Sequence, residues 1–212
     1  MTKKGKFIVL EGGEGAGKSS QIAELKKEFG DSILTTREPG GSPFAEKIRS
    51  LILSPEAGET EAKTLFGLFW AARADHLNKT IIPALTAGRH VLCDRFDSSS
   101  YVYQIYGQED PGLQELFFQV RDVYLGEYRP DLYIYLEIDP QIGLKRKVAQ
   151  TEELSNHFDD RDLDFHWRIK KGFGEFFNSV SCQKVDANLP FEVVREELLQ
   201  IVKLLIGDED KN

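Results

Sequence analysis

The 212-residue chain has little cysteine and no cluster of cysteine with histidine. Its two cysteines, Cys93 and Cys182, lie far apart in apolar stretches, and neither belongs to a CxxC motif. Zinc sites and disulfide frameworks depend on such clusters. We therefore expect two reduced, buried thiols and no zinc.

Long apolar runs are also missing. Three basic residues, Lys3, Lys4 and Lys6, precede an apolar run that is too short for a signal peptide or for the roughly 20 residues of a membrane span. The sequence therefore predicts a cytoplasmic protein without a membrane segment.

The chain has no excess of positive charge. It carries 27 lysines and arginines against 35 acidic residues, a formal net charge of −8, with an isoelectric point of about 5.1. Proteins that bind nucleic acid generally present a basic surface, so we expect no nucleic-acid partner. If the ligand is another polyanion, the positive charge must be concentrated in one cleft.

What the chain does contain is a regular alternation of strand-like and helical stretches, with enough apolar residues (41%) for the core of one domain over residues 1–212. The expected strands cover residues 6–11, 32–36, 90–93, 131–138 and 180–185. The expected helices cover residues 19–29, 43–53, 60–87 with a bend near Pro83, 112–126, 141–149, 163–177 and 191–206. This order predicts an α/β fold with a five-stranded, mostly parallel sheet, helices on both faces, and ligands at the carboxyl ends of the strands.

A glycine-rich stretch, GGEGAGKS, joins the first expected strand to the first expected helix and matches the pattern GxxxxGK[ST]. Glycines accept positive φ and have no Cβ that would keep a phosphate away from the backbone N–H groups. The helix that follows begins with unpaired N–H donors. We predict the P-loop NTPase version of the α/β fold, rather than a glycine-rich turn that binds nothing. The predicted ATP-binding residues are Gly12, Gly13, Glu14, Gly15, Ala16, Gly17, Lys18, Ser19 and Ser20.

Lys18 could reach the β- and γ-phosphates, and the Ser19 hydroxyl could bind Mg²⁺. Asp94 ends the strand-like run HVLCD and could hold the same ion, directly or through water. An aspartate at the end of a strand is common, so this assignment depends on the P-loop beside it. Arg95 follows directly and would direct a fork of donors, suited to phosphate, into the same cleft.

A P-loop does not specify the reaction. The guanine-reading motif NKxD of GTPases is absent. Five other stretches, TREPGG, FWAAR, DRFxxSSxxYQ, YRPDLYIYL and GLKRK, together resemble the bacterial thymidylate kinase family over about residues 7–177. The resemblance implies Mg²⁺-dependent transfer of the γ-phosphoryl group of ATP to dTMP, in the synthesis of dTTP. It also implies a homodimer and a division into CORE, LID and NMP-binding parts, with the LID at about residues 147–163.

The resemblance also implies roles for single residues in binding dTMP. The family stacks a phenylalanine at the position of Phe69 on thymine and uses an arginine at the position of Arg73 on a thymine oxygen. A core phenylalanine and a surface arginine are the alternative. In the family, the residues at the positions of Ser100 and Gln104 contact the edge of the base, and the aromatic residue at the position of Tyr103 lies near the sugar. The alternative for these three residues is a solvated polar face.

Other positions of the family motifs concern the phosphate and the sugar. Arg49 and Arg95 match the arginines that hold the acceptor phosphate. Glu14 matches the acidic residue that approaches the 3′-hydroxyl, or it points into solvent. The Glu38-Pro39 pair matches a site with a cis peptide. The full predicted dTMP-binding set is Glu38, Pro39, Arg49, Phe69, Arg73, Arg95, Ser99, Ser100, Tyr103 and Gln104.

We expect no catalytic base, because the attacking phosphate oxygen of dTMP is already ionised. Alignment and charge neutralisation by Mg²⁺, Lys18 and arginines suffice, and the four histidines are expected to be bystanders. Relatives with Gly or Ala at the position of Ala16 usually supply an arginine from the LID. An ungapped alignment places that arginine on His157, so the LID is poor in arginine. We assign the role to Arg161, with Arg146 as the alternative, because Arg146 lies earlier, on a helix expected to pack on the core. Arg161 could instead be a solvated charge among aspartates, with slower turnover than in relatives. The predicted catalytic residues are Lys18, Arg95, Glu14 and Arg161.

Two other functions remain possible from the sequence. One is another nucleotide or deoxynucleoside kinase of the same superfamily, although Arg49 and Arg95 favour a monophosphate acceptor. The other is a nucleotide-binding module that no longer transfers phosphate. The low number of arginines in the LID suggests this alternative.

Overall fold

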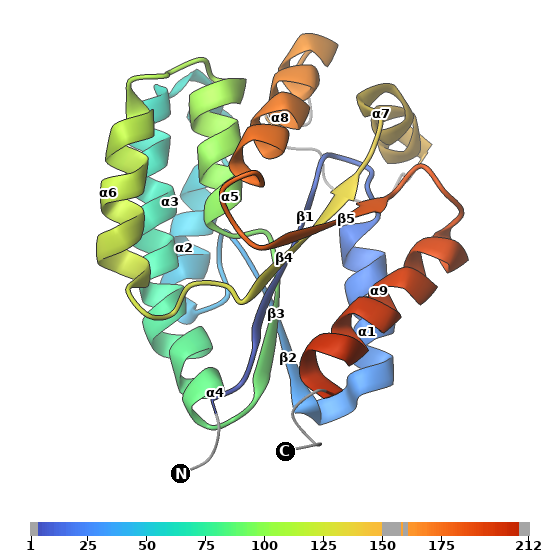
Figure 1. Ribbon diagram of the computed structural model, residues 1–212. Helices are drawn as coiled ribbons and strands as arrows, with labels where there is room; N and C mark the ends of the chain where they lie inside the picture. The colour runs from blue at the N-terminus through green and yellow to red at the C-terminus, as the bar shows by residue number, and fades with distance from the viewer. Residues whose placement is uncertain (1–3, 150–157, 159–160, 208–212) are drawn as a thin grey trace.

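A computed structural model describes residues 4–149, 158 and 161–207. Five strands form one sheet in the order β2-β3-β1-β4-β5, and every neighbouring pair is parallel (Figure 1). The strands are β1 (Phe7–Gly12), β2 (Ile33–Arg37), β3 (His90–Asp94), β4 (Leu132–Glu137) and β5 (Cys182–Asp186). The predicted five-stranded α/β fold is confirmed. Most of the predicted LID lies outside the described residues.

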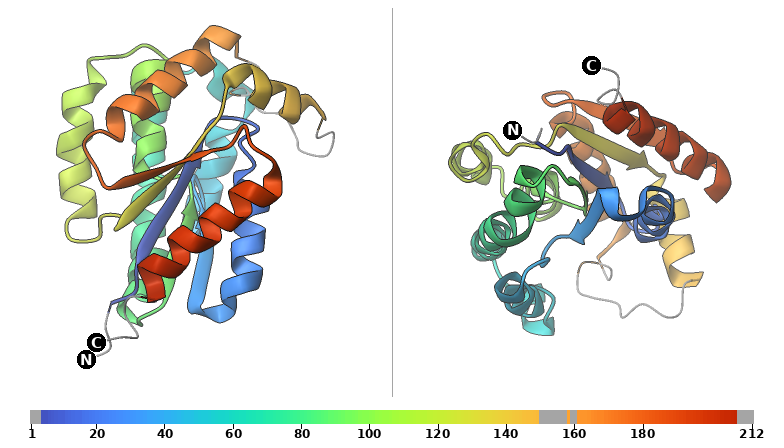
Figure 2. Two further views of the ribbon diagram at one scale, coloured as in Figure 1. Left: turned by 45° about the vertical axis from the view of Figure 1, so that its right-hand side comes forward. Right: turned by 90° about the horizontal axis from the view of Figure 1, so that it is seen from below.

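Helices cover both faces of the sheet. On one face α1 packs beside α9, as Figures 1 and 2 show, and the other face carries α2, α3, α5, α6 and α8. The helices are α1 (Lys18–Phe29), α2 (Pro43–Ile52), α3 (Ala62–His76), α4 (Ile82–Thr86), α5 (Asp97–Ser100), α6 (Leu113–Leu125), α7 (Pro140–Ala149), α8 (Leu163–Phe176) and α9 (Phe191–Gly207). Short helical turns are η1 (Gly30–Ser32), η2 (Pro55–Glu59), η3 (Leu77–Ile81) and η4 (Tyr101–Gly107).

Two of these helical stretches have wider, π-helical turns. The long helix expected over 60–87 is α3, continued through the π-helical η3 into α4. Pro83 lies at the start of α4. Within a regular helix, proline removes one backbone hydrogen bond and its ring clashes with the carbonyl group one turn earlier. The wider π-helical turn before Pro83 accommodates this clash. The second case is α5 followed by the π-helical η4, a stretch that is not among the helices expected from the sequence.

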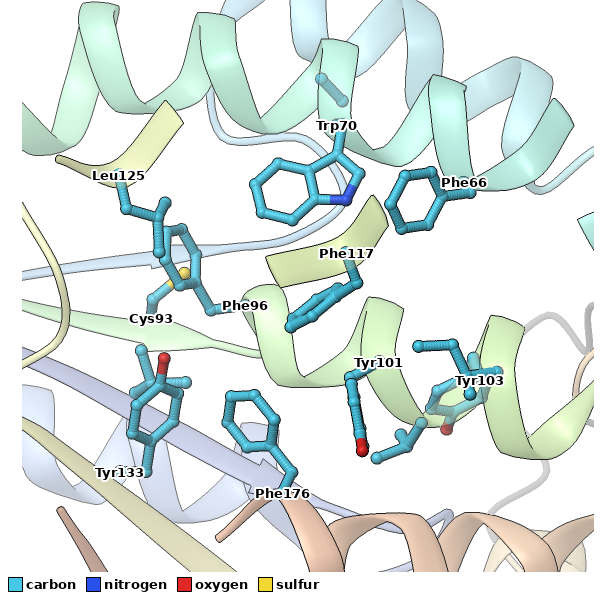
Figure 3. Close-up of a cluster of buried hydrophobic side chains, with 14 of the residues drawn as sticks. Phe66, Trp70, Cys93, Phe96, Tyr101, Tyr103, Phe117, Leu125, Tyr133 and Phe176 are labelled. Carbon is cyan, nitrogen blue, oxygen red and sulfur yellow. The ribbon is translucent and has the colours of Figure 1, made fainter. Parts of the chain in front are cut away.

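Alternation along β1 divides the core in two. Phe7 and Val9 face the larger core under α3, α6 and α8, whereas Ile8 and Leu10 face the core under α1 and α9. The larger core is rich in aromatic rings, and its centre is shown in Figure 3. Trp70 and Tyr101 both pack on Phe117, with ring centroids 5.8 and 5.2 Å apart. This packing fixes α3 and η4, which both line the cavity described below.

A buried ion pair fixes the start of α5. Asp97, which is fully buried, accepts hydrogen bonds from Arg121 Nε of α6 and from the Tyr133 hydroxyl of β4. Burying the carboxylate without these donors would be costly. The three side chains therefore hold α5 against the sheet at one position.

The expectation for the cysteines is only partly right. Both are free, and Cys93 is buried as expected, but Cys182 at the edge of the sheet is partly exposed. Among the described residues, no helix combines the length and apolar character that crossing a membrane would require.

Candidate active site

A cavity of about 820 Å³ lies where β1, β2 and β3 end, at the carboxyl edge of the sheet. The loops after these strands form its floor, and α2, α3, η4 and α7 supply its walls. Its lining residues from the P-loop are Glu14, Gly15, Ala16, Gly17, Lys18, Ser19 and Ser20. Its other lining residues are Arg37, Glu38, Pro39, Arg49, Leu53, Pro55, Phe69, Arg73, Asp94, Arg95, Phe96, Ser99, Tyr103, Lys147 and Phe158.

The P-loop adopts a conformation that requires glycine. Gly15 and Gly17 have φ of 68° and 84°, and Gly17 directly precedes the first residue of α1. The Lys18 ammonium folds back over the loop and donates to the carbonyl oxygens of Gly12 and Gly13 at 2.9 and 3.2 Å. Burial lowers the pKa of Lys18. The loop thus presents the start of α1 and a buried cation to the cavity.

The two predicted metal ligands lie together. Ser19 Oγ donates to Asp94 Oδ2 at 3.2 Å. Asp94 Oδ1 is buried and has no hydrogen-bond partner among the described residues. Hydroxyl and carboxylate oxygens are the ligands that Mg²⁺ prefers. These two side chains therefore fit a magnesium ion, which the unpartnered carboxylate oxygen would help to hold.

Glu14 does not point into solvent. Its Oε1 accepts hydrogen bonds from Arg95 Nη2 at 2.6 Å and from the Tyr103 hydroxyl at 3.1 Å, and its Oε2 lies 3.3 Å from Lys147 Nζ. Burial by itself would raise the pKa of Glu14, but the positive charges of Arg95, Lys18 and Lys147 hold it well below its ordinary value. Glu14 is therefore an ionised carboxylate bound between cations.

A second buried carboxylate, Glu11, supports the turn that carries Arg95. Arg95 has a left-handed backbone with φ of 66°, which is rare for residues other than glycine and asparagine. Glu11 is fully buried and accepts from the next backbone N–H, that of Phe96, at 3.0 Å and from the hydroxyls of Ser98 and Ser99. Burial raises the pKa of Glu11. Glu11 thus holds the turn in the conformation that brings the Arg95 guanidinium to Glu14.

Arg73 is a buried residue of the cavity wall and not a surface arginine. Its Nε donates to Glu38 Oε2 at 2.7 Å, Nη1 to Ser100 Oγ at 3.1 Å and Nη2 to the Phe96 carbonyl at 2.9 Å. The Glu38-Pro39 peptide is cis. Phe69, one helical turn before Arg73, lines the same cavity.

His76 supports Glu38 from behind. The histidine is fully buried, its Nδ1 lies 3.1 Å from Glu38 Oε1 and its Nε2 lies 2.7 Å from Thr36 Oγ1. It does not line the cavity. His76 therefore belongs to the supporting structure of the cavity, and the expectation that the histidines take no part in catalysis stays a prediction.

The remaining predicted residues divide into two groups. Arg49 lines the cavity and donates to the Pro39 carbonyl at 2.7 Å, and Ser99 and Tyr103 line it as well. Gln104 is fully buried, and neither of its amide atoms has a partner among the described residues, but it does not line the cavity.

Arg161 is not brought into the cavity. Its Nη2 donates to the Gly58 carbonyl at 3.1 Å, and its guanidinium lies over the Phe165 ring. The alternative, Arg146, donates to the carbonyl oxygens of Ala187 and Asn188. His157 lies outside the described residues.

Sequence reasoning missed several residues of the site. Glu11 had one usable signal, a carboxylate inside the otherwise apolar strand FIVLEG. For Lys147 the only signal was its place in the basic run KRK, in which the sequence alone does not show which side chain faces the cavity. The missed residues of the wall and its support are Glu11, Arg37, Leu53, Pro55, His76, Phe96, Lys147 and Phe158.

The glycine-rich loop between β1 and α1, facing an aspartate at the end of β3, makes this chain a P-loop NTPase-fold protein. Comparison with known proteins narrows this class. The family model "Thymidylate kinase" matches residues 10–198. The chain belongs to the thymidylate kinase family.

Individual relatives agree with the family model. The thymidylate kinase of Shouchella clausii is 37% identical, and the match covers 98% of this chain and 100% of that protein. The thymidylate kinase of Shewanella amazonensis is 41% identical over 92% of this chain and 94% of that protein. The crystal structure of thymidylate kinase from Ehrlichia chaffeensis matches with a TM-score of 0.72 and 26% identity, over 94% of this chain and 99% of that one.

Replacing Glu11 should loosen the turn at Arg95. In Glu11→Ala three donors lose their acceptor, and an unsatisfied buried donor costs about 1–3 kcal/mol. We expect the Phe96 amide to exchange its hydrogen about tenfold to a hundredfold faster, whereas Glu11→Gln, which keeps an acceptor oxygen, stays close to wild type. Hydrogen exchange followed by NMR measures both, with the Glu38 amide, bonded to the Asp94 carbonyl, as reference. Unchanged exchange at Phe96 in Glu11→Ala would refute the supporting role.

Replacing Glu14 should destabilise the protein in a pH-dependent way. Because the folded-state pKa of Glu14 is depressed below the ordinary value of about 4.3, its ionised form stabilises the fold above that value, and the contribution is lost as the pH falls toward the folded-state pKa. Glu14→Gln should therefore lower the free energy of unfolding by about 1–3 kcal/mol near pH 7 and by less near pH 4.

Urea unfolding of both proteins at the two pH values measures this difference. Glu115→Gln, on the exposed face of α6, is the control and should have little effect at either pH. A Glu14→Gln effect that stays constant or grows on acidification would contradict the assignment.

Proposed function

We propose that this protein transfers the γ-phosphoryl group of ATP to dTMP, giving dTDP and ADP in the synthesis of dTTP. The observation that carries the proposal is that one cavity is lined both by the P-loop and by Phe69 and Arg73 of α3. A P-loop accounts for the donor triphosphate, and Phe69 with Arg73 accounts for an acceptor with a flat base. Membership of the thymidylate kinase family supports dTMP as that acceptor.

The donor half of the cavity suits ATP with magnesium. The backbone N–H groups of the loop and of the first turn of α1 would hold the phosphates, with Lys18 on the β- and γ-phosphates. Ser19 and Asp94 would hold Mg²⁺. When bound, the ion would neutralise the charge that develops between the β- and γ-phosphates.

The acceptor half suits a thymine nucleotide. The Phe69 ring offers a stacking face. Three of the five N–H donors of the Arg73 guanidinium are used by Glu38, Ser100 and Phe96, which leaves two for a base oxygen. Arg73 is therefore held in place before any ligand binds, which lowers the entropy lost on binding.

The remaining roles follow the family motifs. Arg49 and Arg95 would bind the acceptor phosphate, Glu14 and Tyr103 would lie near the sugar, and Ser99, Ser100 and Gln104 would contribute to the base side with Glu38 and Pro39. Ser100 and Gln104 are buried and do not line the cavity, so Ser100 would act through its hydrogen bond with Arg73. Arg161, assigned to charge neutralisation from the sequence, lies on Gly58 and does not line the cavity. Catalysis needs no base, because alignment and charge neutralisation act on an ionised nucleophile.

A coupled assay of ADP release with ATP and Mg²⁺ tests the proposal. The acceptors are dTMP, dUMP, UMP, CMP, AMP, GMP and thymidine, and we expect clear preference for dTMP. Arg73→Met should lower kcat/KM for dTMP about a hundredfold or more, because it removes the N–H groups that donate to the thymine oxygen and leaves Glu38 buried without its arginine. Arg129→Met, which affects an exposed ion pair with Asp122, should change it little.

Preference for another monophosphate would show that the pocket around Phe69 and Arg73 was misassigned. ATP binding without turnover of any acceptor would favour the non-catalytic alternative.

We further propose that the chain is one domain over residues 1–212, with the LID at about 147–163, and that it works in the cytoplasm as a homodimer. For the dimer, α6 exposes the apolar side chains Leu116, Val123 and Tyr124 on one face, at the spacing i, i+7, i+8, and it packs beside α3 through Tyr124 and Trp70. Such a patch on one helix is typical of an interface between subunits. The net charge of −8 supports the absence of a nucleic-acid partner.

Sedimentation analysis of Val123→Glu tests the dimer. We expect wild type to sediment as a dimer and Val123→Glu as a monomer, because the charge would be buried in the interface. Val193→Glu on α9 is the matched control and should stay dimeric. A monomeric wild type would refute the proposal.

A further inference from the structure

Six cationic side chains line the cavity, and one of them comes from a different part of the chain. Lys18, Arg37, Arg49, Arg73 and Arg95 belong to the first half of the sequence. Lys147 near the end of α7 is the only lining cation that the described residues of the second half contribute. The role of this residue is not explained by the P-loop or by the pocket for the base.

Helix α7 lies in direct backbone contact with the P-loop. A Cβ on Gly15 would lie 2.0 Å from the carbonyl oxygen of Gly143, and a Cβ on Gly143 would lie 2.2 Å from the carbonyl oxygen of Glu14. Any side chain at either position would push the two backbones apart. Two glycines, one in the loop and one in the helix, therefore let α7 approach the phosphate-binding loop.

Helical spacing then directs Lys147 to the cavity. It lies four residues after Gly143, on the same face of α7. Its Nζ lies 3.3 Å from Glu14 Oε2, whereas Lys145 on the same helix is exposed. The position of Lys147 thus follows from the contact between Gly15 and Gly143.

Arg95 and Lys147 each contact a different oxygen of the Glu14 carboxylate. A phosphoryl group also presents several oxygens with negative charge, and both lysine and arginine bind such oxygens through charge-assisted hydrogen bonds. A phosphoryl group that enters between the two cations can therefore replace Glu14 as their partner.

The arginines that flank this region have other partners. Arg146 donates to carbonyl oxygens near the start of α9, and Arg161 donates to the Gly58 carbonyl. Neither lines the cavity. Among the described residues after β4, the geometry therefore favours a lysine over an arginine as the cation that reaches the phosphates.

We propose that Lys147 is a phosphate-binding residue of this kinase. When the nucleotides bind, Lys147 leaves Glu14 and donates a hydrogen bond to the γ-phosphoryl group that passes from ATP to dTMP. This inference rests on the proposed function. It assigns to Lys147 the charge-neutralising role that the sequence motifs suggested for Arg161.

Kinetics and binding of Lys147→Met, Lys147→Arg and Lys145→Met test the proposal. We expect Lys147→Met to lower kcat for dTMP about a hundredfold, as the loss of one charge-stabilising donor does in other enzymes. It should also weaken binding of the magnesium complex of AMP-PNP, measured by calorimetry. Lys147→Arg should restore much of both quantities, and Lys145→Met should match wild type.

Two results would overturn the assignment. One is a Lys147→Met enzyme whose kcat and AMP-PNP affinity both equal those of Lys145→Met. The other is a loss that Lys147→Arg does not restore at all, which would indicate packing and not charge. A wild-type enzyme without activity on dTMP would instead refute the proposed function, so the two failures are distinguishable.

Discussion

The site depends on holding several positive charges close together in a protein whose net charge is −8. Two like charges about 4 Å apart repel by about 4 kcal/mol at an effective dielectric constant near 20. Arg95 and Lys147, which contact the two oxygens of Glu14, and Lys18 nearby would repel one another without an anion between them. Glu14 supplies that anion, and its depressed pKa shows how strongly the cations favour its ionised form. The carboxylate in the phosphate-binding loop therefore stabilises the cation cluster.

The rest of the fold brings these charges to one place. Because all five strands are parallel, the loops after β1, β2 and β3 end at the same edge of the sheet. Glu11, buried within β1, fixes the turn after β3, so two neighbouring strands together determine the position of Arg95. The aromatic core holds α3 and η4 rigidly behind the pocket, and the Asp97–Arg121 pair fixes α5. Rigid placement of donors is what binding and phosphoryl transfer both need.

The sequence predicted the parts of the site that lie within short motifs. The P-loop, the Asp94–Arg95 pair and the Phe69–Arg73 spacing each occupy a few consecutive residues, and the structure places all of them around one cavity. Glu11 was missed because a strand that is buried along its whole length usually carries apolar residues at every position. His76 was missed because its partner Glu38 lies 38 residues away in the sequence.

Lys147 could not be predicted for a different reason. In the run KRK the choice among three cations depends on the rotation of α7, which is set by the contact of Gly143 with Gly15. The π-helical turn η4 likewise depends on packing against α8 and not on a local motif. In both cases a tertiary contact, which leaves no mark in a short stretch of sequence, decides which side chain reaches the cavity.

A crystal structure with dTMP and the magnesium complex of AMP-PNP would test most directly whether Glu14 holds the place of a phosphoryl group. We predict that Lys147 Nζ and the Arg95 guanidinium then lie within hydrogen-bond distance of phosphate oxygens, and that Lys147 no longer contacts Glu14. A structure in which both nucleotides are bound while Lys147 remains on Glu14, away from every phosphate, would contradict this account.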